Sequence, residues 1–150
     1  MKVQEIMRRI VHTVRAEATI EDASRQMLNE NIGLLPVVET ALVEESQLRE
    51  NVVGKIGFLP VVEEDVMVGV LTTRDIVIRA IAQGKDPRTA PVSEIMTHNF
   101  ACCYEDNDIS EALAIIGQRK VRRLFVLNSD KKLVGIISRG DIWSAKLDAH

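Results

Sequence analysis

The spacing of apolar and polar residues along the first half of the chain predicts one small unit of alternating strands and helices. The predicted order is strand, helix, strand, strand, helix, over residues 11–14, 19–31, 33–39, 66–72 and 73–84. Thr19 is a suitable N-cap for the first helix, and Gly84 is a suitable C-cap for the second. These elements predict a unit of the α+β class.

The chain also repeats itself on a large scale. VQEIM at 3–7 matches VSEIM at 92–96, and GVLTTRDI at 69–76 matches GIISRGDI at 135–142. The first two segments lie 89 residues apart along the chain, whereas the second two lie only 66 residues apart. The first repeat therefore contains residues that the second repeat lacks. The stretch KDPRTAP at 85–91, between the two repeats, contains two prolines, which predict a linker. We therefore expect two domains joined by a linker, at 1–84, 85–91 and 92–150.

A shorter duplication accounts for the extra residues. IGLLPVVE at 32–39 recurs as IGFLPVVE at 56–63, and each copy follows a helix-like stretch, the second one at 42–55. The duplicated insert thus covers about residues 40–63.

A small sheet has room for only one copy of the duplicated strand. The copy at 57–62 has the shorter connection to the strand at 66–72, and short hairpin loops are the low-cost solution. We therefore expect residues 57–62 in the centre of the sheet. The copy at 33–38 is expected at a sheet edge or paired with another protomer, because a bare apolar edge promotes association.

Composition narrows the class of protein. Hydrophobic residues make up 46% of the chain and aromatic residues only 3%, which predicts an aliphatic core. A net charge of -3 argues against nucleic-acid binding. No apolar run is long enough to cross a membrane, and the first residues lack a signal-peptide pattern, so a cytoplasmic protein without membrane contact is expected.

The nucleophilic and metal-ligating residue types form no recognisable set. Cys102 and Cys103 are adjacent, too few for a structural zinc site and badly placed to bridge each other. The three histidines show no metal-ligand spacing. We therefore predict reduced thiols, no metal site and no enzymatic activity.

One repeated motif carries candidate chemistry, Gly-x-x-[Thr/Ser]-x-x-Asp. It occurs as Gly69, Thr72 and Asp75, and again as Gly135, Ser138 and Asp141. Each copy lies where a predicted strand gives way to a helix. Two interpretations remain open: each carboxylate caps free backbone N–H groups, or it accepts the hydroxyls of a ribose while the helix start faces a phosphate.

These motifs together resemble a family. EIM, then GLLPVVE, then GVLTTRDI is similar to a CBS (cystathionine-β-synthase) domain, and two in tandem resemble a CBS pair, or Bateman module, over 2–39 and 56–147. Residues 72–96 are particularly similar to stand-alone bacterial CBS-pair proteins of the hypoxic-response type.

The resemblance implies a fold and a function. The fold is two packed β-α-β-β-α units with pseudo-twofold symmetry, here with an extra helix–strand element in the first. The function is that of a non-catalytic regulatory module that requires no cofactor and binds AMP, ADP, ATP or S-adenosylmethionine in clefts between the domains. A homodimer and an unknown regulated protein are the implied partners. The alternative is a degenerate pair that acts as a structural or interaction module without ligand.

The resemblance also implies ligand-binding residues. In it the Asp holds the ribose, the Thr or Ser lies by the ribose or phosphate, and two strands line the adenine. Carried over, the ligand-binding residues of the first domain are Thr13, Val14, Leu59, Pro60, Thr72, Arg74 and Asp75. Those of the second are Cys102, Cys103, Arg122, Arg123, Leu124, Ser138, Arg139 and Asp141. Phe125 departs from the pattern, since the family usually has Pro there. The basic run at 119–123 is either a solvated helix end or a set of phosphate contacts.

Overall fold

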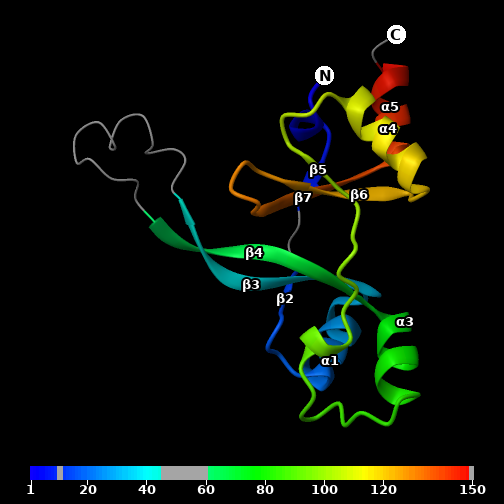
Figure 1. Cartoon of the computed structure of the whole chain (residues 1–150). Helices are drawn as coiled ribbons and strands as arrows, with labels where there is room; N and C mark the ends of the chain where they lie inside the picture. Colours follow the sequence, from blue (N-terminus) through cyan, green and yellow to red (C-terminus); the bar gives the residue numbers. More distant parts are fainter. Residues whose placement is uncertain (10–11, 45–60, 149–150) are drawn as a thin grey trace. The chain divides into compact units, whose positions relative to one another are not determined.

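The structure, a computed structural model, describes residues 1–9, 12–44 and 61–148 and has the predicted α+β class (Figure 1). The chain forms two compact units. We call them the central unit, Val11–Glu39 with Val66–Phe100, and the C-terminal unit, Met1–Ile10 with Thr40–Asp65 and Ala101–His150. No helix in the described part of the chain is long and apolar enough to span a membrane.

The central unit is built on a sheet with strand order β2-β3-β4. Its elements are β2 (Val14–Arg15), α1 (Ile20–Glu30), β3 (Leu34–Glu44), β4 (Val61–Thr72), α3 (Thr73–Asp75), the π-helical η3 (Ile76–Ile81) and the 3-10 turn η4 (Val92–Glu94). The Thr19 hydroxyl accepts a hydrogen bond from the Asp22 N–H at 3.1 Å, which confirms the predicted N-cap. Gly84 has a φ of +74°, as a C-terminal glycine does after a helix.

Buried side chains of α1, β3, β4 and the segment from η4 to Ile95 contribute to the core of the central unit. The largest fully buried ones are Ile20, Leu35, Leu71, Val37, Val92 and Ile95. All are aliphatic, as the composition predicts. The core therefore includes the VSEIM segment that begins the second sequence repeat.

The C-terminal unit repeats this order of elements. It comprises η1 (Val3–Glu5), β1 (Arg8–Arg9), β5 (Cys102–Tyr104), α4 (Ile109–Arg119), β6 (Arg123–Leu127), β7 (Leu133–Ser138) and α5 (Arg139–Asp148). Its sheet has the order β1-β7-β6-β5, with β5 parallel to β6 and the other neighbours antiparallel. Val3 of the VQEIM segment is fully buried in its core, beside residues of the second repeat.

Each VxEIM segment thus packs in the unit built from the other repeat. Val3 N–H donates to Asn107 O at 2.9 Å, and Val92 N–H donates to Ala18 O at 2.8 Å, so the two attachments are equivalent. The domain boundaries predicted from sequence, 1–84 and 92–150, follow the repeat, whereas the compact units follow the packing.

The prediction for the duplicated strand is wrong. The first copy, not the second, holds the central place: β3 contains residues 34–38 and pairs in parallel with β2, with Val14 opposite Val37. The described residues of the second copy, 61–63, form the beginning of β4, which continues to Thr72. Figure 1 shows β3 and β4 side by side in opposite directions. The connection from α1 to the first copy is as short as a hairpin loop, so loop length did not discriminate between the copies.

The helix expected at 42–55 is also contradicted at its start. Leu42–Glu44 belongs to β3, and residues 45–55 lie outside the described part of the chain. The duplication therefore lengthens both strands of the hairpin.

A close backbone approach explains the glycine of the repeated motif. A Cβ on Gly69 would lie 2.7 Å from Met96 Sδ and 3.0 Å from the carbonyl oxygen of Thr97. A Cβ on Gly135 would lie 2.7 Å from Met7 Sδ and 2.8 Å from the carbonyl oxygen of Arg8. The segment after EIM lies directly on the strand at both places, so any larger residue must push it away.

We expect Gly135→Ala to lower the free energy of unfolding by about 1–3 kcal/mol, because the new methyl group overlaps a backbone atom that cannot rotate away. For a chain of this size, each kcal/mol lowers Tm by about 2–4 °C. Gly117→Ala is the matched control: it lies in α4 with nothing within 4 Å of its Cβ position, so Tm should hold or rise. Equal Tm values for the two variants would refute the close approach.

Deleting residues 40–63 should leave a folded protein. This deletion joins Glu39 to Glu64, and none of the described residues it removes belongs to either core. A shorter loop also costs less closure entropy, so stability should change by no more than about 1 kcal/mol. Circular dichroism and thermal unfolding test this. An unfolded variant would mean that the insert is integral to a core.

Candidate functional site

The motif hydroxyl and carboxylate cap a helix in both units. In the central unit, Thr72 N–H donates to Asp75 Oδ2 at 3.0 Å, and Asp75 N–H donates to Thr72 Oγ1 at 3.1 Å. In the C-terminal unit, the same reciprocal bonds join Ser138 and Asp141, both at 3.0 Å. The capping interpretation of the motif is therefore confirmed, and each pair satisfies two backbone donors at a strand-to-helix turn.

The remaining contacts of Asp75 come from the segment after η4 and from Arg79. The Thr97 hydroxyl donates to the two carboxylate oxygens at 3.2 and 3.3 Å, and Arg79 Nε lies 3.7 Å from Oδ1. The Arg79 guanidinium also donates to the backbone oxygens of Ile95 and Met96. Asp75 is 7% exposed, so this carboxylate is enclosed by its own partners.

Asp141 has a different neighbour. Arg8 Nη2 donates to Asp141 Oδ1 at 3.3 Å, and the Arg8 side chain is 77% exposed. A pocket of about 260 Å³ adjoins this ion pair, lined by Arg8, Arg123, Ile136, Ser138 and Asp141. The motif of the C-terminal unit therefore opens onto a pocket that two guanidinium groups flank.

Burial alone would raise the pKa of Asp141. Hydrogen bonds from the Ser138 backbone and hydroxyl, with the positive charge of Arg8, outweigh that effect and hold the pKa below its ordinary value. The carboxylate thus remains ionised at neutral pH.

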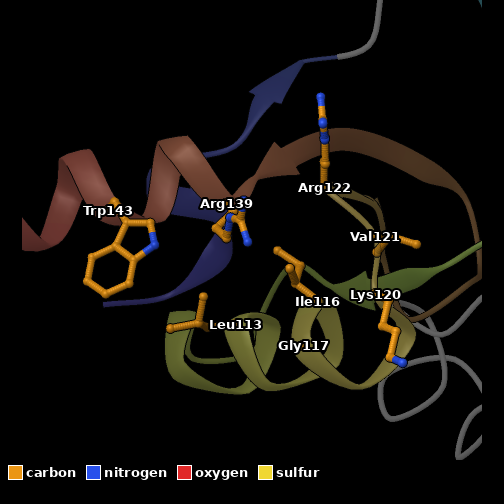
Figure 2. A pocket seen from close by; sticks show the side chains of 8 residues that line it. All are labelled: Leu113, Ile116, Gly117, Lys120, Val121, Arg122, Arg139 and Trp143. Atoms are coloured by element: carbon orange, nitrogen blue, oxygen red, sulfur yellow. The ribbon is translucent and has the colours of Figure 1, made fainter.

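The arginines predicted as phosphate contacts separate into two places. Arg123 lines the pocket beside Asp141, as the resemblance implies. Arg122 and Arg139 line another pocket instead, of about 630 Å³, between α4 and the start of α5, with Trp143 at one end (Figure 2). Arg74 is exposed on the helix start of the central unit.

The residues predicted to line the adenine are mostly in the cores. Val14, Cys103 and Leu124 are buried, so only their backbones are available to a ligand. Thr13 is exposed and its carbonyl accepts a hydrogen bond from Gln26 at 3.0 Å. Leu59 and Pro60 lie outside the described residues.

The cysteines lack the properties of reactive thiols. Burial raises the pKa of Cys103 to about 12, and burial also raises the pKa of Cys102. Both thiols are therefore protonated at neutral pH, which disfavours nucleophilic chemistry.

Comparison with known proteins identifies the family. The family model of the CBS domain matches residues 3–45 and again residues 92–142. The chain belongs to the CBS-domain family. The two matched regions follow the sequence repeat, so the chain is a CBS pair.

This CBS pair has relatives of the hypoxic-response type. Hypoxic response protein 1 of Mycobacterium tuberculosis is 33% identical over 120 residues, which cover 79% of this chain and 81% of that protein. A solved structure of Hypoxic Response Protein I with two coordinated zinc ions matches with a TM-score of 0.69 and 28% identity, over 97% of this chain and 98% of that one. This similarity confirms the resemblance to the hypoxic-response type.

Two further solved CBS structures share the fold and contain adenosine-based ligands. CBSX2 in complex with AMP has a TM-score of 0.65 and 20% identity, with 99% of this chain and 97% of that one covered. The CBS pair of protein MJ0100, with 5-methylthioadenosine and S-adenosyl-L-methionine, has a TM-score of 0.63 and 22% identity, with coverage of 100% and 98%.

The zinc of the hypoxic-response structure has no counterpart in the described residues. Among them, no group of three or more His, Cys, Asp or Glu side chains is placed to hold a metal ion.

Sequence reasoning missed Arg8 and Thr97, which contact the motif carboxylates from the segments after EIM. Each directly follows the methionine of an EIM segment. That shared position was visible in the repeat, but nothing in the sequence indicated that it faces the aspartate of the other repeat.

Proposed function

We propose that this CBS pair is a non-catalytic regulatory module that binds an adenine nucleotide, one of AMP, ADP, ATP or S-adenosylmethionine, at sites that include Asp75 and Asp141. The observation that carries the proposal is the pocket beside Asp141. An ionised carboxylate there lies next to a hydroxyl and two guanidinium groups. A carboxylate suits ribose hydroxyls, and guanidinium groups suit phosphate.

Regulation would follow from population shift. A ligand that binds one conformation of the pair better than another moves the equilibrium by its difference in affinity. The protein that reads this change would be a separate regulated partner.

We further propose that the module works as a homodimer through the central unit. Leu28, Val77, Ile78 and Ile81 are large apolar side chains with roughly half or more of their surface exposed. Leu28 and Val77 line a groove between α1 and η3 together with Met27, Ile32 and Ile76. A second copy of the same face would cover this apolar surface.

Substituting the motif aspartates tests the nucleotide sites. We expect Asp75→Asn and Asp141→Asn each to weaken binding at its own site by more than about tenfold, because an amide cannot accept two ribose hydroxyls as a carboxylate does. The Asn side-chain oxygen can still accept the backbone N–H of Thr72 or Ser138, so we expect the fold to be preserved. Calorimetric titration of wild type and variants with AMP, ADP, ATP and S-adenosylmethionine measures the effect.

The matched control is Asp108→Asn. Asp108 is the N-cap of α4 and accepts from the Ser110 N–H at 3.0 Å, outside both motifs, so binding should stay at the wild-type level. If Asp75→Asn, Asp141→Asn and the double variant all titrate like wild type, the nucleotide sites are wrongly assigned.

A charge on the apolar groove tests the homodimer. Val77→Glu with Ile81→Glu should convert a dimer to a monomer in light scattering, because burying two carboxylates in the interface costs more than the apolar contact returns. Leu42→Glu is the control, since Leu42 is also exposed but lies on β3. Unchanged mass in the double variant would place the dimer elsewhere or exclude it.

One observation favours the alternative of a structural or interaction module without ligand. The Asp75 carboxylate is enclosed by Thr72, Thr97 and Arg79, so a ligand has to compete with these partners for it. The titrations above separate the two functions, since a structural module gives no binding heat with any of the four nucleotides.

A further inference from the structure

The two motif carboxylates have equivalent positions but unequal surroundings. β1 places Arg8 next to Asp141, and the same position of the other repeat places Thr97 next to Asp75. Gly135 and Gly69 allow these approaches, since Arg8 O and Thr97 O lie over them in the same way. The two sites therefore differ at the residue that meets the carboxylate.

The second difference lies across the sheet. Arg123 of β6 stands opposite Ser138 of β7, so both side chains are on the same face, next to Asp141. The repeat places Leu34 where Arg123 stands, and Leu34 is apolar and partly buried. The arginine that contacts Asp75 is Arg79, whose guanidinium is held by the backbone oxygens of Ile95 and Met96.

We propose that Arg8 and Arg123 make the Asp141 site specific for a ligand that carries phosphate, and that Arg8 is the residue that sets this specificity. The inference rests on the proposed nucleotide site and adds to it that the two sites select different ligands. The Asp75 site has Thr97 and Leu34 in place of the two arginines, and its Arg79 is held by backbone oxygens, so we expect this site to discriminate less than the Asp141 site between adenosine ligands with and without phosphate.

The contacts of Asp141 explain how Arg8 acts. Oδ2 accepts from the Ser138 N–H and Oδ1 accepts from Arg8, so a ribose hydroxyl that binds Oδ1 competes with Arg8 for this oxygen. Arg8 is mostly exposed, and an exposed ion pair contributes little, so it is readily displaced. A phosphate in the pocket gives Arg8 a new anionic partner as it leaves the carboxylate. A ligand without phosphate offers no such partner and leaves Arg8 competing for Asp141.

The experiment compares AMP with adenosine at each site separately. In Asp75→Asn, which retains the Asp141 site, AMP should bind at least about tenfold more tightly than adenosine, as expected for charge-assisted hydrogen bonds to phosphate. Adding Arg8→Thr, which copies Thr97, should bring the ratio of AMP affinity to adenosine affinity close to one. Adenosine should bind more tightly and AMP more weakly than before. In Asp141→Asn, which retains the Asp75 site, the two ligands should bind within about threefold of each other.

Two further variants distinguish the position of a charge from its mere presence. Arg9→Thr removes the same charge from the neighbouring exposed position of β1, and the preference for AMP should survive. Arg123→Leu, which copies Leu34, should reduce the preference without affecting the Arg8 contact.

The outcomes distinguish a failure of this inference from a failure of the proposed nucleotide sites on which it rests. If the two Asp→Asn variants lose binding but Arg8→Thr leaves the ratio of AMP affinity to adenosine affinity unchanged, the role of Arg8 is overturned and the nucleotide sites stand. If Arg9→Thr lowers the ratio as much as Arg8→Thr does, the role of Arg8 is also overturned, because the loss of any positive charge then explains the effect. Failure of both Asp→Asn variants to change binding removes the nucleotide sites themselves.

Discussion

A glycine that lets one backbone segment lie directly on another organises both units. At Gly69 and Gly135 the strand has no side chain on the side where Met96 or Met7 crosses it. This contact anchors the VxEIM segment, whose valine fills the core beside it. It also fixes the next residue, Thr97 or Arg8, within hydrogen-bond distance of the motif carboxylate. The glycine therefore controls both the packing of a core and the composition of a site.

The aspartate of the motif caps a helix and is also the proposed acceptor for a ribose, and these two roles compete only in part. As a helix cap, it uses Oδ2 to accept a backbone N–H, in the same way in both units. Oδ1 has different neighbours in the two units: the Thr97 hydroxyl and Arg79 in one, and Arg8 in the other. Both repeats therefore share the cap and differ in the neighbours of the second oxygen.

Local patterns predicted the parts of the fold that local physics determines. Thr19 and the apolar face of α1 predicted the first helix correctly, and the matched EIM and GVLTTRDI segments identified the repeat. The place of the duplicated strand could not be predicted, because both copies have nearly the same sequence and both have short connections. What decides it is the pairing of β2 with β3, a contact between segments on either side of α1.

Only those residues of the candidate site that lie close together in the sequence could be predicted. Ser138 and Asp141 were found because they lie three residues apart on one turn. Arg8 could not be found, because it reaches Asp141 from the opposite end of the sequence. Similarly, the basic run looked like one cluster, but Arg123 begins β6 and Arg122 lies in the bend before it, and the two line different pockets.

The crossing of the VxEIM segments has a consequence for the origin of the chain. Val3 completes a core made by the second repeat, and Val92 completes one made by the first. A single ancestral repeat with this geometry would have obtained its valine and methionine from a second molecule, in the manner of a domain-swapped dimer. Fusion of two such repeats would turn an exchange between two chains into an exchange within one, with residues 85–91 as the connection.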